Sequence, residues 1–428
     1  MSFKVFKDVL PSGLTCITVE TKHLHSAMCS VYVRVGSRHE STRTNGVSHL
    51  LEHLFFRGST RFPDSVRMNA AVEAVGGNLN GVTMRDSSYF YTPTHPDGIG
   101  VAMSILGDML TQPRLVHLAT EKKIILEEML DEVDEKGRDI DVDNLTKMKL
   151  FDDHPLAFKI AGTPKTVKGL QMKDVKAHFG THYVTGNMVV GVAGPLRHDE
   201  MLERAQRAFS RLPRGPRVNE TPPPLQDEAT FHYVRLEESQ VEFRLTFPTV
   251  ADHHPDAMAL SLLRRVLDDG LSSRLPHNIV EKRGLAYSIA ASIETFHDTG
   301  SFEIDGACAP EQAGAVVKEV LSTLSTLRRG KIGLDELRRA QRRFEMHIDF
   351  MQDSPGDLIG WFGHSELFRP AETFDEKKAQ ARAVTLKELV RVARQYLVAD
   401  RLVTIAVGPK TAKTPMERAA AQARRLLR

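Results

Sequence analysis

The stretch His49-Leu50-Leu51-Glu52-His53 decides how the rest of the chain is interpreted. On a helix over 47–56, the apolar residues share one face, and His49, Glu52 and His53 share the roughly opposite face. Histidines four positions apart can bind one metal ion, and imidazole suits zinc. The glutamate between them lies where a general base for a zinc-bound water has to be. The alternative is ordinary surface polarity, because the chain has 18 histidines and the bare pattern also arises by chance.

Length and composition are those of a globular protein with two or more domains: 428 residues, 41% hydrophobic and 26% charged. Lys+Arg (57) nearly balance Asp+Glu (55), so we expect no nucleic-acid partner. No apolar run reaches membrane-spanning length, and the N-terminus carries no apolar signal region. Three scattered cysteines form no framework, which predicts a reducing, cytoplasmic compartment and argues against cysteine ligands (Cys16, Cys29 and Cys308).

The segments around the motif predict strands before it and a mixture of helix and strand after it. Residues 3–36 read as strands, and the motif helix follows a polar loop and ends at Gly58. Residues 82–92, rich in Thr, Ser and Tyr, predict one strand at a sheet edge. An extended peptide could add to such an edge through backbone hydrogen bonds, although an ordinary polar edge strand is equally compatible with the segment.

A charged helix predicted over 120–136 places two carboxylates, Glu121 and Glu128, on its apolar stripe. A buried carboxylate needs a compensating partner, and a metal ion with its supporting residues would supply one. Alternatively, both side chains lie in water at the rim of the stripe. The acidic run over 127–143 reads as a solvated face, which would attract basic peptides if it lined a cleft.

A proline-rich stretch divides the chain almost in half. Residues 210–228 contain five prolines and three arginines without periodicity, which is typical of a linker. We therefore predict a metal-bearing domain over 1–212, a linker over 213–228 and a second domain over 229–428.

The second half repeats the order of elements of the first. A strand at 241–247 leads into a helix at 256–269, which aligns without a gap to the motif helix. There the metal-capable positions hold Ser261, Arg264 and Arg265, and further on Arg343 stands opposite Glu128. Positions that change together in this way behave as one functional set.

With these features together, the chain resembles the pitrilysin family of zinc peptidases, whose inverzincin motif is His-x-x-Glu-His. The resemblance is to the branch that includes the mitochondrial processing peptidases and their bacterial relatives. It rests on the following stretches: Leu10–Leu14, Val35–Arg38, His49–Gly58, Gly76–Asn80, Glu121–Glu128, Ser272–Leu275 and Glu281–Ser288. It implies an α+β fold of two similar domains, each a mainly antiparallel sheet covered by helices, which form a clamshell around peptides. Family members commonly work as dimers.

The resemblance also assigns roles to residues of the first half. His49, His53 and Glu128 match three zinc ligands, and Glu52 matches the general base. Glu121 matches an accessory glutamate, seven residues before the distant ligand. The cofactor implied is therefore Zn²⁺.

Three further residues are implied to meet the substrate. Asn80 matches an asparagine that contacts substrate backbone, and Phe56 lines a side-chain pocket. Tyr287 matches a tyrosine of the second domain that binds substrate and steadies the transition state. Its usual companion, an arginine seven residues earlier, is replaced by Val280, and Arg283 is out of register.

These observations predict a zinc-dependent endopeptidase that cleaves unfolded peptides or presequence-like segments, with Glu52, Glu121 and Tyr287 as catalytic candidates. Two alternatives stay open. The chain could be the zinc-bearing subunit of a heterodimer whose related partner supplies the Arg/Tyr pair, rather than a self-sufficient homodimer. It could also be a non-catalytic peptide-binding scaffold.

Overall fold

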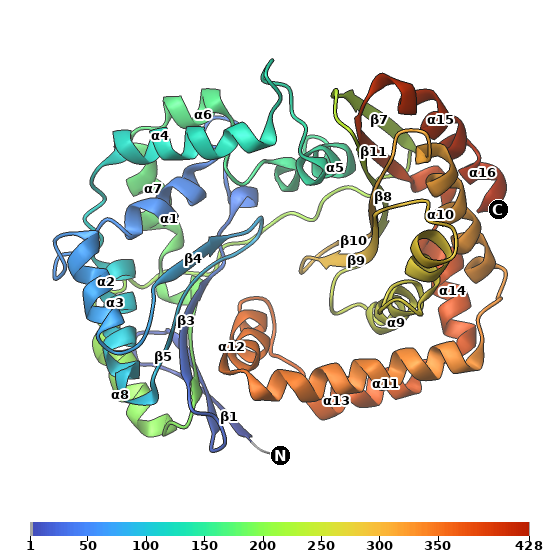
Figure 1. Ribbon diagram of the computed structural model, residues 1–428. Coiled ribbons are helices and arrows are strands. Elements are labelled where there is room, and N and C mark those ends of the chain that lie inside the picture. The colour runs from blue at the N-terminus through green and yellow to red at the C-terminus, as the bar shows by residue number, and fades with distance from the viewer. Residues whose placement is uncertain (1–2, 428) are drawn as a thin grey trace. The chain divides into compact units, whose positions relative to one another are not determined.

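The computed structural model describes residues 3–427, which form two compact units, each built on one β-sheet (Figure 1). Unit 1 contains the chain up to Met129 together with Phe158–Thr221 and Asp349–Thr373. Unit 2 contains Leu130–Ala157, Pro222–Ile348 and the chain from Phe374 onward. Each half of the sequence therefore gives one short segment to the unit formed mainly by the other half. After Phe158–Thr221 of unit 1, the chain enters unit 2 at Pro222, and this crossing falls inside the predicted linker.

The sheet of unit 1 is mixed and has six strands in the order β1-β2-β6-β3-β5-β4. Only β2 and β6 run parallel, and the other neighbours are antiparallel. The strands are β1 (Phe3–Val9), β2 (Thr15–Thr21), β3 (Ala27–Val33), β4 (Asn80–Thr83), β5 (Ser88–Thr94) and β6 (Met188–Gly194). The single strand expected over 82–92 is wrong: a turn at 84–87, closed by the Met84 amide donating to the Ser87 carbonyl, splits it into β4 and β5. The edge position is held by β4.

Seven helices cover one face of this sheet, and their apolar faces form the core of unit 1 with its strands. They are α1 (Val47–Phe55), α2 (Ser65–Glu73), α3 (Ile99–Thr111), α4 (Leu118–Glu128), α6 (Pro164–Gly169), α7 (Met172–His182) and α8 (His198–Ala208). The motif helix is α1, as predicted. The charged helix is shorter than predicted, because it ends at Glu128 and continues only as a 3₁₀ turn, Met129–Glu132.

The opposite face of the first sheet is covered by the segment from the second half of the sequence. It contains α12 (Pro355–Ile359) and the π-helical turn Gly360–His364. A Cβ on Gly191, in the middle of β6, would lie 2.5 Å from the Ile359 side chain, so this approach requires glycine. With helices on both faces, every residue of β6 is buried, which explains its almost wholly apolar sequence.

The sheet of unit 2 repeats five strands of the first sheet, in the order β7-β11-β8-β10-β9. Here too only one pair, β7 and β11, is parallel. The strands are β7 (Thr230–Arg235), β8 (Val241–Thr249), β9 (Ser288–Thr295), β10 (Gly300–Cys308) and β11 (Val403–Gly408). The α+β fold class and the internal repeat predicted from the sequence are confirmed by this topology.

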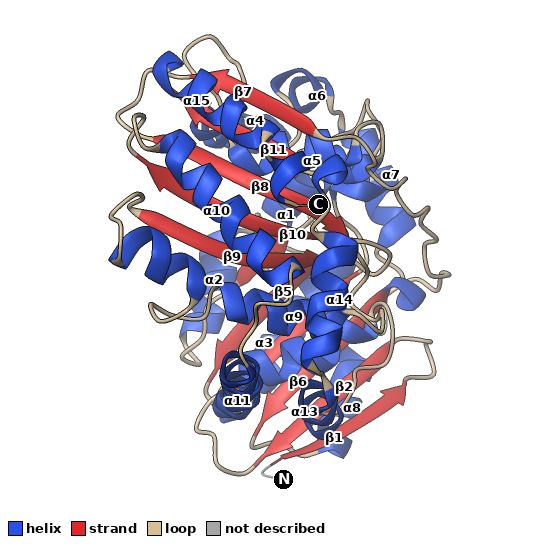
Figure 2. Ribbon diagram, turned by 90° about the vertical axis from the view of Figure 1, so that its right-hand side faces the viewer, coloured by secondary structure: helices blue, strands red, loops and turns tan. Residues whose placement is uncertain are grey.

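Helices also cover both faces of the second sheet. Figure 2 shows α9, α10 and α14 across one face, and α5 packs on the other face, against β8 and β11. The helices of this unit are α5 (Val142–Phe151), α9 (Ala257–Leu267), α10 (Ala313–Arg328), α11 (Leu334–Phe350, its last two residues in unit 1), α13 (Phe374–Ala383), α14 (Leu386–Tyr396), α15 (Lys410–Ala421) and α16 (Ala423–Leu426). None of the helices in residues 3–427 combines the length and apolar character that crossing a bilayer requires.

The linker predicted over 210–228 has no helix or strand, but it is not free of unit 1. Glu220 is almost fully buried and accepts two hydrogen bonds from the Arg34 guanidinium, both 2.9 Å long. Its Oε1 also lies 2.6 Å from His39 Nε2. The chain therefore leaves unit 1 immediately after a buried ion pair.

Candidate metal centre

The motif helix α1 starts from a carboxylate that lies outside the helix. Gly46 has a left-handed conformation with φ 94°, so the chain turns sharply there. Glu40, 8% exposed, accepts hydrogen bonds of 2.7 Å from the Gly46 and Ser48 amides and 2.8 Å from the Asn45 side chain. A carboxylate at this end satisfies free N–H groups and complements the helix dipole. Glu40 thus fixes the start of the helix that carries the two histidines.

This cap gives a testable pH dependence. Burial raises the pKa of Glu40 to about 7 from its ordinary 4.5, although the Asn45, Ser48 and Gly46 donors act in the opposite direction. The folded chain therefore binds this proton more tightly than the unfolded chain, and Glu40 contributes stability that is complete below pH 4.5 and lost as the pH rises through about 7. We expect the unfolding free energy of the wild type minus that of Glu40→Gln to fall by about 1–3 kcal/mol over this window.

Urea unfolding of the metal-free chain at a series of pH values measures this difference. The matched control is Glu73→Gln, an exposed glutamate of α2 in the same unit. If the unfolding free energy of the wild type minus that of Glu40→Gln stays level or rises with pH, the raised pKa assigned to Glu40 is wrong.

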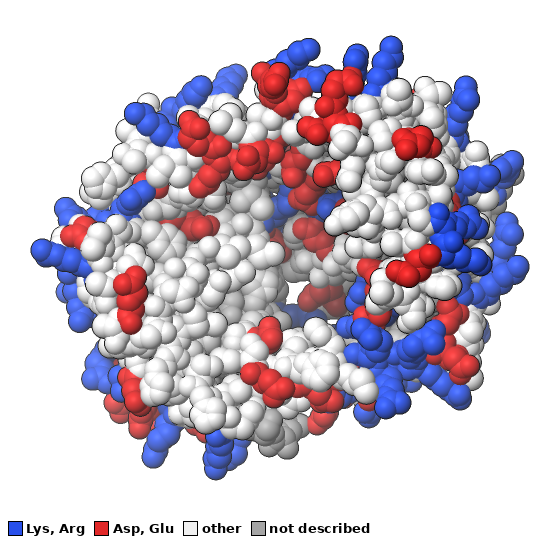
Figure 3. Space-filling model, viewed as in Figure 1, with Lys and Arg blue, Asp and Glu red and all other residues white. Residues whose placement is uncertain are grey.

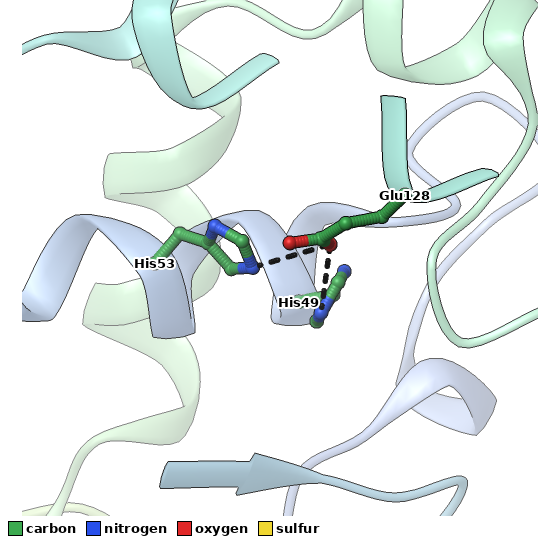
Figure 4. Close-up of side chains that lie close together, drawn as sticks. All are labelled: His49, His53 and Glu128. Carbon is green, nitrogen blue, oxygen red and sulfur yellow. Dashed lines mark ion pairs between the residues drawn. The ribbon is translucent and has the colours of Figure 1, made fainter. Parts of the chain in front are cut away.

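Three predicted ligands meet between α1 and α4 (Figure 4). Glu128 Oε2, at the last residue of α4, lies 3.6 Å from His53 Nε2 and 4.0 Å from His49 Nε2. One donor atom from each of the three residues lies within 4.8 Å of the others. Two ligands of a tetrahedral zinc, each about 2.0–2.1 Å from the metal, are roughly 3.3 Å apart. The donor types and their spacing therefore fit zinc after only a small closure.

His53 is oriented by a carboxylate that is itself paired. Glu121, 1% exposed, places Oε2 3.3 Å from His53 Nδ1, and its Oε1 accepts a hydrogen bond from Arg57 Nε. With Nδ1 occupied, Nε2 of His53 is directed at Glu128, the arrangement by which carboxylates orient metal-binding histidines. Of the two carboxylates on the stripe of α4, Glu121 is thus buried and compensated, whereas Glu128 is exposed. The sequence analysis did not identify Arg57, although the need of a buried glutamate for a cation was a signal for it.

The protonation state of His49 also suits a metal ligand. Burial and the neighbouring His53 lower the pKa of His49 to about 4, so its imidazole is neutral at neutral pH. Its Nδ1 is buried and has no hydrogen-bond partner among the described residues. The site is open on the side of Glu128, whose side chain is 47% exposed against 19% for His49. Figure 3 shows acidic side chains near the C-terminal end of α4, where Glu128 lies.

Glu52 is held beside the histidines by the edge strand. Thr83 Oγ1, at the end of β4, donates a 2.5 Å hydrogen bond to Glu52 Oε2. Burial raises the pKa of Glu52 above its ordinary value, while the bond from Thr83 and the nearby His53 pull it down. A carboxylate with increased proton affinity is suited to general-base work near neutral pH. Thr83 is a second residue that the sequence analysis missed.

The edge strand approaches α1 at a glycine. A Cβ on Gly81 would lie 2.9 Å from the ring of Phe56 and 3.1 Å from Glu52 Cγ. Phe56 thus packs beside β4 and against Phe90, with ring centroids 6.5 Å apart. Asn80 begins β4, and its side-chain amide donates to the Asn78 carbonyl at 3.2 Å. Among residues 3–427, β4 pairs with β5 alone, so its outer edge has no strand partner beside the candidate metal centre.

The remaining predicted residue, Tyr287, belongs to unit 2. Its side chain is 83% exposed, and its amide donates to the Ala307 carbonyl at the start of β9. Val280 lies in a π-helical turn, and Arg283 pairs with Glu319 at 2.7 Å. The role of Tyr287 stays a prediction.

Comparison with known proteins identifies the family. Residues 15–164 match the family described as Insulinase (Peptidase family M16), and residues 169–344 match Peptidase M16 inactive domain. The chain belongs to the M16 peptidase family. The pitrilysin-type resemblance seen in the sequence is thereby confirmed. The M16 inactive-domain match covers most of the part of the chain in which the metal-capable residues are replaced.

Curated relatives of this M16 chain are named zinc proteases. An uncharacterized zinc protease of Streptomyces coelicolor is 29% identical over 92% of this chain and 87% of its own length. One from Bacillus subtilis is 25% identical over 91% and 95% of the two chains. The chain is therefore of the M16 zinc-protease type.

Solved structures share the fold. A protease from Helicobacter pylori superposes with a TM-score of 0.87 at 22% identity, covering 95% of this chain and all of the other. A Pseudomonas fluorescens structure described as a peptidase M16 inactive domain gives 0.86 at 20% identity, with 96% and 99% covered.

Proposed function

We propose that this M16 chain is a zinc endopeptidase that cleaves unfolded peptides or presequence-like segments. The observation that carries the proposal is the convergence of His49, His53 and Glu128 from two helices, with Glu52 beside them. Zinc, when bound, supplies Lewis acidity, which polarises a peptide carbonyl and makes water a stronger acid.

The residues of the chain then have distinct tasks. His49, His53 and Glu128 hold the metal, and Glu121, with Arg57, keeps His53 in the productive orientation. Glu52 takes a proton from the attacking water and returns it to the leaving amine.

Substrate binding is assigned to the edge of the first sheet. A peptide that adds as a strand beside β4 would be held by backbone hydrogen bonds, with Asn80 contacting its main chain and Phe56 lining a side-chain pocket. In this proposal Tyr287 of unit 2 stabilises the oxyanion.

The replacement of the expected arginine by Val280 favours a second form of the same function. In that form the chain is the zinc-bearing subunit of a dimer whose related partner supplies the arginine. Assays of the chain alone and together with a candidate partner, on a quenched unstructured peptide, distinguish this form from a self-sufficient homodimer.

Metal binding is the first test of the proposal. We expect about one zinc per purified chain, loss of peptide cleavage on chelation, and recovery when zinc is returned. The double variant His49→Ala/His53→Ala should lose zinc, because it removes two of three protein ligands. Metal analysis measures this, with His277→Ala, an exposed histidine of unit 2, as the matched control. Full zinc content in the double variant would place the metal elsewhere.

A further inference from the structure

The place in unit 2 that corresponds to the metal centre holds a network of arginines. Helix α9 aligns with α1, and α11 carries Arg343 opposite Glu128 of α4. Arg265, at the position of His53, donates to both oxygens of Asp269 at 3.2 and 3.1 Å. Arg343 donates to the same carboxylate at 2.8 and 3.3 Å. Arginine side chains, through Asp269, thus join α9 and α11 at the place in unit 2 that corresponds to the meeting of α1 and α4 in unit 1.

A small cavity lies among these side chains. Its volume is about 60 Å³, and it is lined by Arg265, Arg339 and Arg343 together with Asp269, Ser273 and Glu336. One water needs about 10–15 Å³ of such space, so the cavity has room for an occupant of a few atoms.

The positive charges around this cavity exceed the negative ones. Asp269 is already shared by two guanidinium groups, and Glu336 accepts two 2.7 Å hydrogen bonds from Arg274 and one from the Gly333 amide. Both carboxylates are therefore engaged by other groups. Arg339 acts on Glu336 through its charge but makes no hydrogen bond or ion pair with it or with any other residue in 3–427.

An arginine that lines the cavity has one buried, unpaired donor. The Arg265 side chain is 10% exposed, and its Nε–H has no hydrogen-bond partner among residues 3–427. Phe344 covers the guanidinium, with its ring centroid 5.5 Å away. A charged donor left unsatisfied in this way is unfavourable unless something in the cavity accepts from it.

We propose that the cavity binds one small anion, a halide or a carboxylate, which accepts from Arg265 Nε and balances Arg339. Guanidinium groups are matched to such ligands because they are permanently charged and present several N–H donors. The two units would then bind ions of opposite charge at corresponding positions, a cation in unit 1 and an anion in unit 2. The ligand is expected to be negatively charged because the arginines that line the cavity outnumber its two carboxylates, which are already engaged.

Bromide is the probe, because its anomalous scattering identifies it directly in crystals of the full chain. We expect a peak within hydrogen-bond range of Arg265 Nε. In solution, bromide added to a halide-free buffer should raise the unfolding temperature of the wild type, because an ion that binds only the folded state stabilises it.

The exposed Arg339 provides a variant that leaves the fold intact. Arg339→Gln should need at least about tenfold more bromide for the same thermal shift, whereas Arg338→Gln should behave as the wild type. Arg338 is the matched control because it is its neighbour on α11 and 68% exposed. If acetate competes with bromide, the site binds carboxylates. If acetate does not compete, the site binds halides. No bromide peak at saturation, or equal bromide dependence in the two variants, would overturn the proposal. Neither the bromide peak nor the thermal shift depends on peptide cleavage, so this test is independent of the proposed function.

Discussion

Glu52→Gln is expected to lower the rate of peptide cleavage by about 10²–10⁴-fold while the zinc content stays that of the wild type. Glutamine keeps the size of the side chain and an oxygen that accepts from Thr83 Oγ1, so the position beside the ligands is retained. It cannot take a proton from water. Since Glu52 is not a donor in the His49, His53 and Glu128 group, metal binding should be unaffected.

Cleavage of a quenched unstructured peptide and metal analysis of the same preparations measure the two effects. Glu73→Gln, on the neighbouring helix α2, controls for the loss of one negative charge in unit 1. Wild-type rates in Glu52→Gln would show that the base assignment is wrong. If the wild type is active only with a partner subunit, both variants are compared in that complex, which keeps the test decisive.

The sequence predicted the parts of the candidate metal centre that depend on local periodicity. His49, Glu52 and His53 share one face of α1 because a helix repeats about every four residues, and that follows from the motif alone. The assignment of Glu128 as the third ligand rested on the family resemblance. Thr83 and Glu40 were missed because their roles depend on where an edge strand and a loop pass α1, which no short-range pattern encodes. Arg57 was missed because its role depends on the approach of α4, which carries Glu121, to the end of α1.

The repeat of the two halves predicted the two similar sheets but not the exchange of segments between the units. The apolar stripe of α5 shows that the helix covers a core, and its sequence gives no sign of which sheet that core belongs to. The same holds for α12, whose Ile359 approaches Gly191 in β6 although the two residues are far apart in the sequence. The mostly apolar sequences of β6 and β11 were a signal for it, since a strand that is apolar on both faces needs a cover on each.

The attachment of α5 to the second sheet depends on a buried charge, which gives the largest predicted effect on stability. Lys147 of α5 is fully buried, and its Nζ lies 2.6 Å from Glu303 of β10 and also pairs with Glu294 of β9. Burial raises the pKa of Glu303, but the charges of Lys147 and Arg244 outweigh it and hold the pKa below its usual value. Lys147 and Glu303 are thus ionised, paired and withdrawn from water, whereas Glu294 is partly exposed.

Lys147→Met should lower the unfolding free energy by about 3–5 kcal/mol, because it removes one of the two cations that pair with the buried Glu303 and the partner of the partly exposed Glu294. Hydrogen exchange should show the loss first in the amides of α5, Val142–Phe151, since that helix would lose its ionic attachment. The double variant Lys147→Met/Glu303→Gln should recover part of the loss, because it also removes one stranded charge. A single variant within about 0.5 kcal/mol of the wild type would mean that water reaches the pair and that apolar packing alone holds α5 on the sheet.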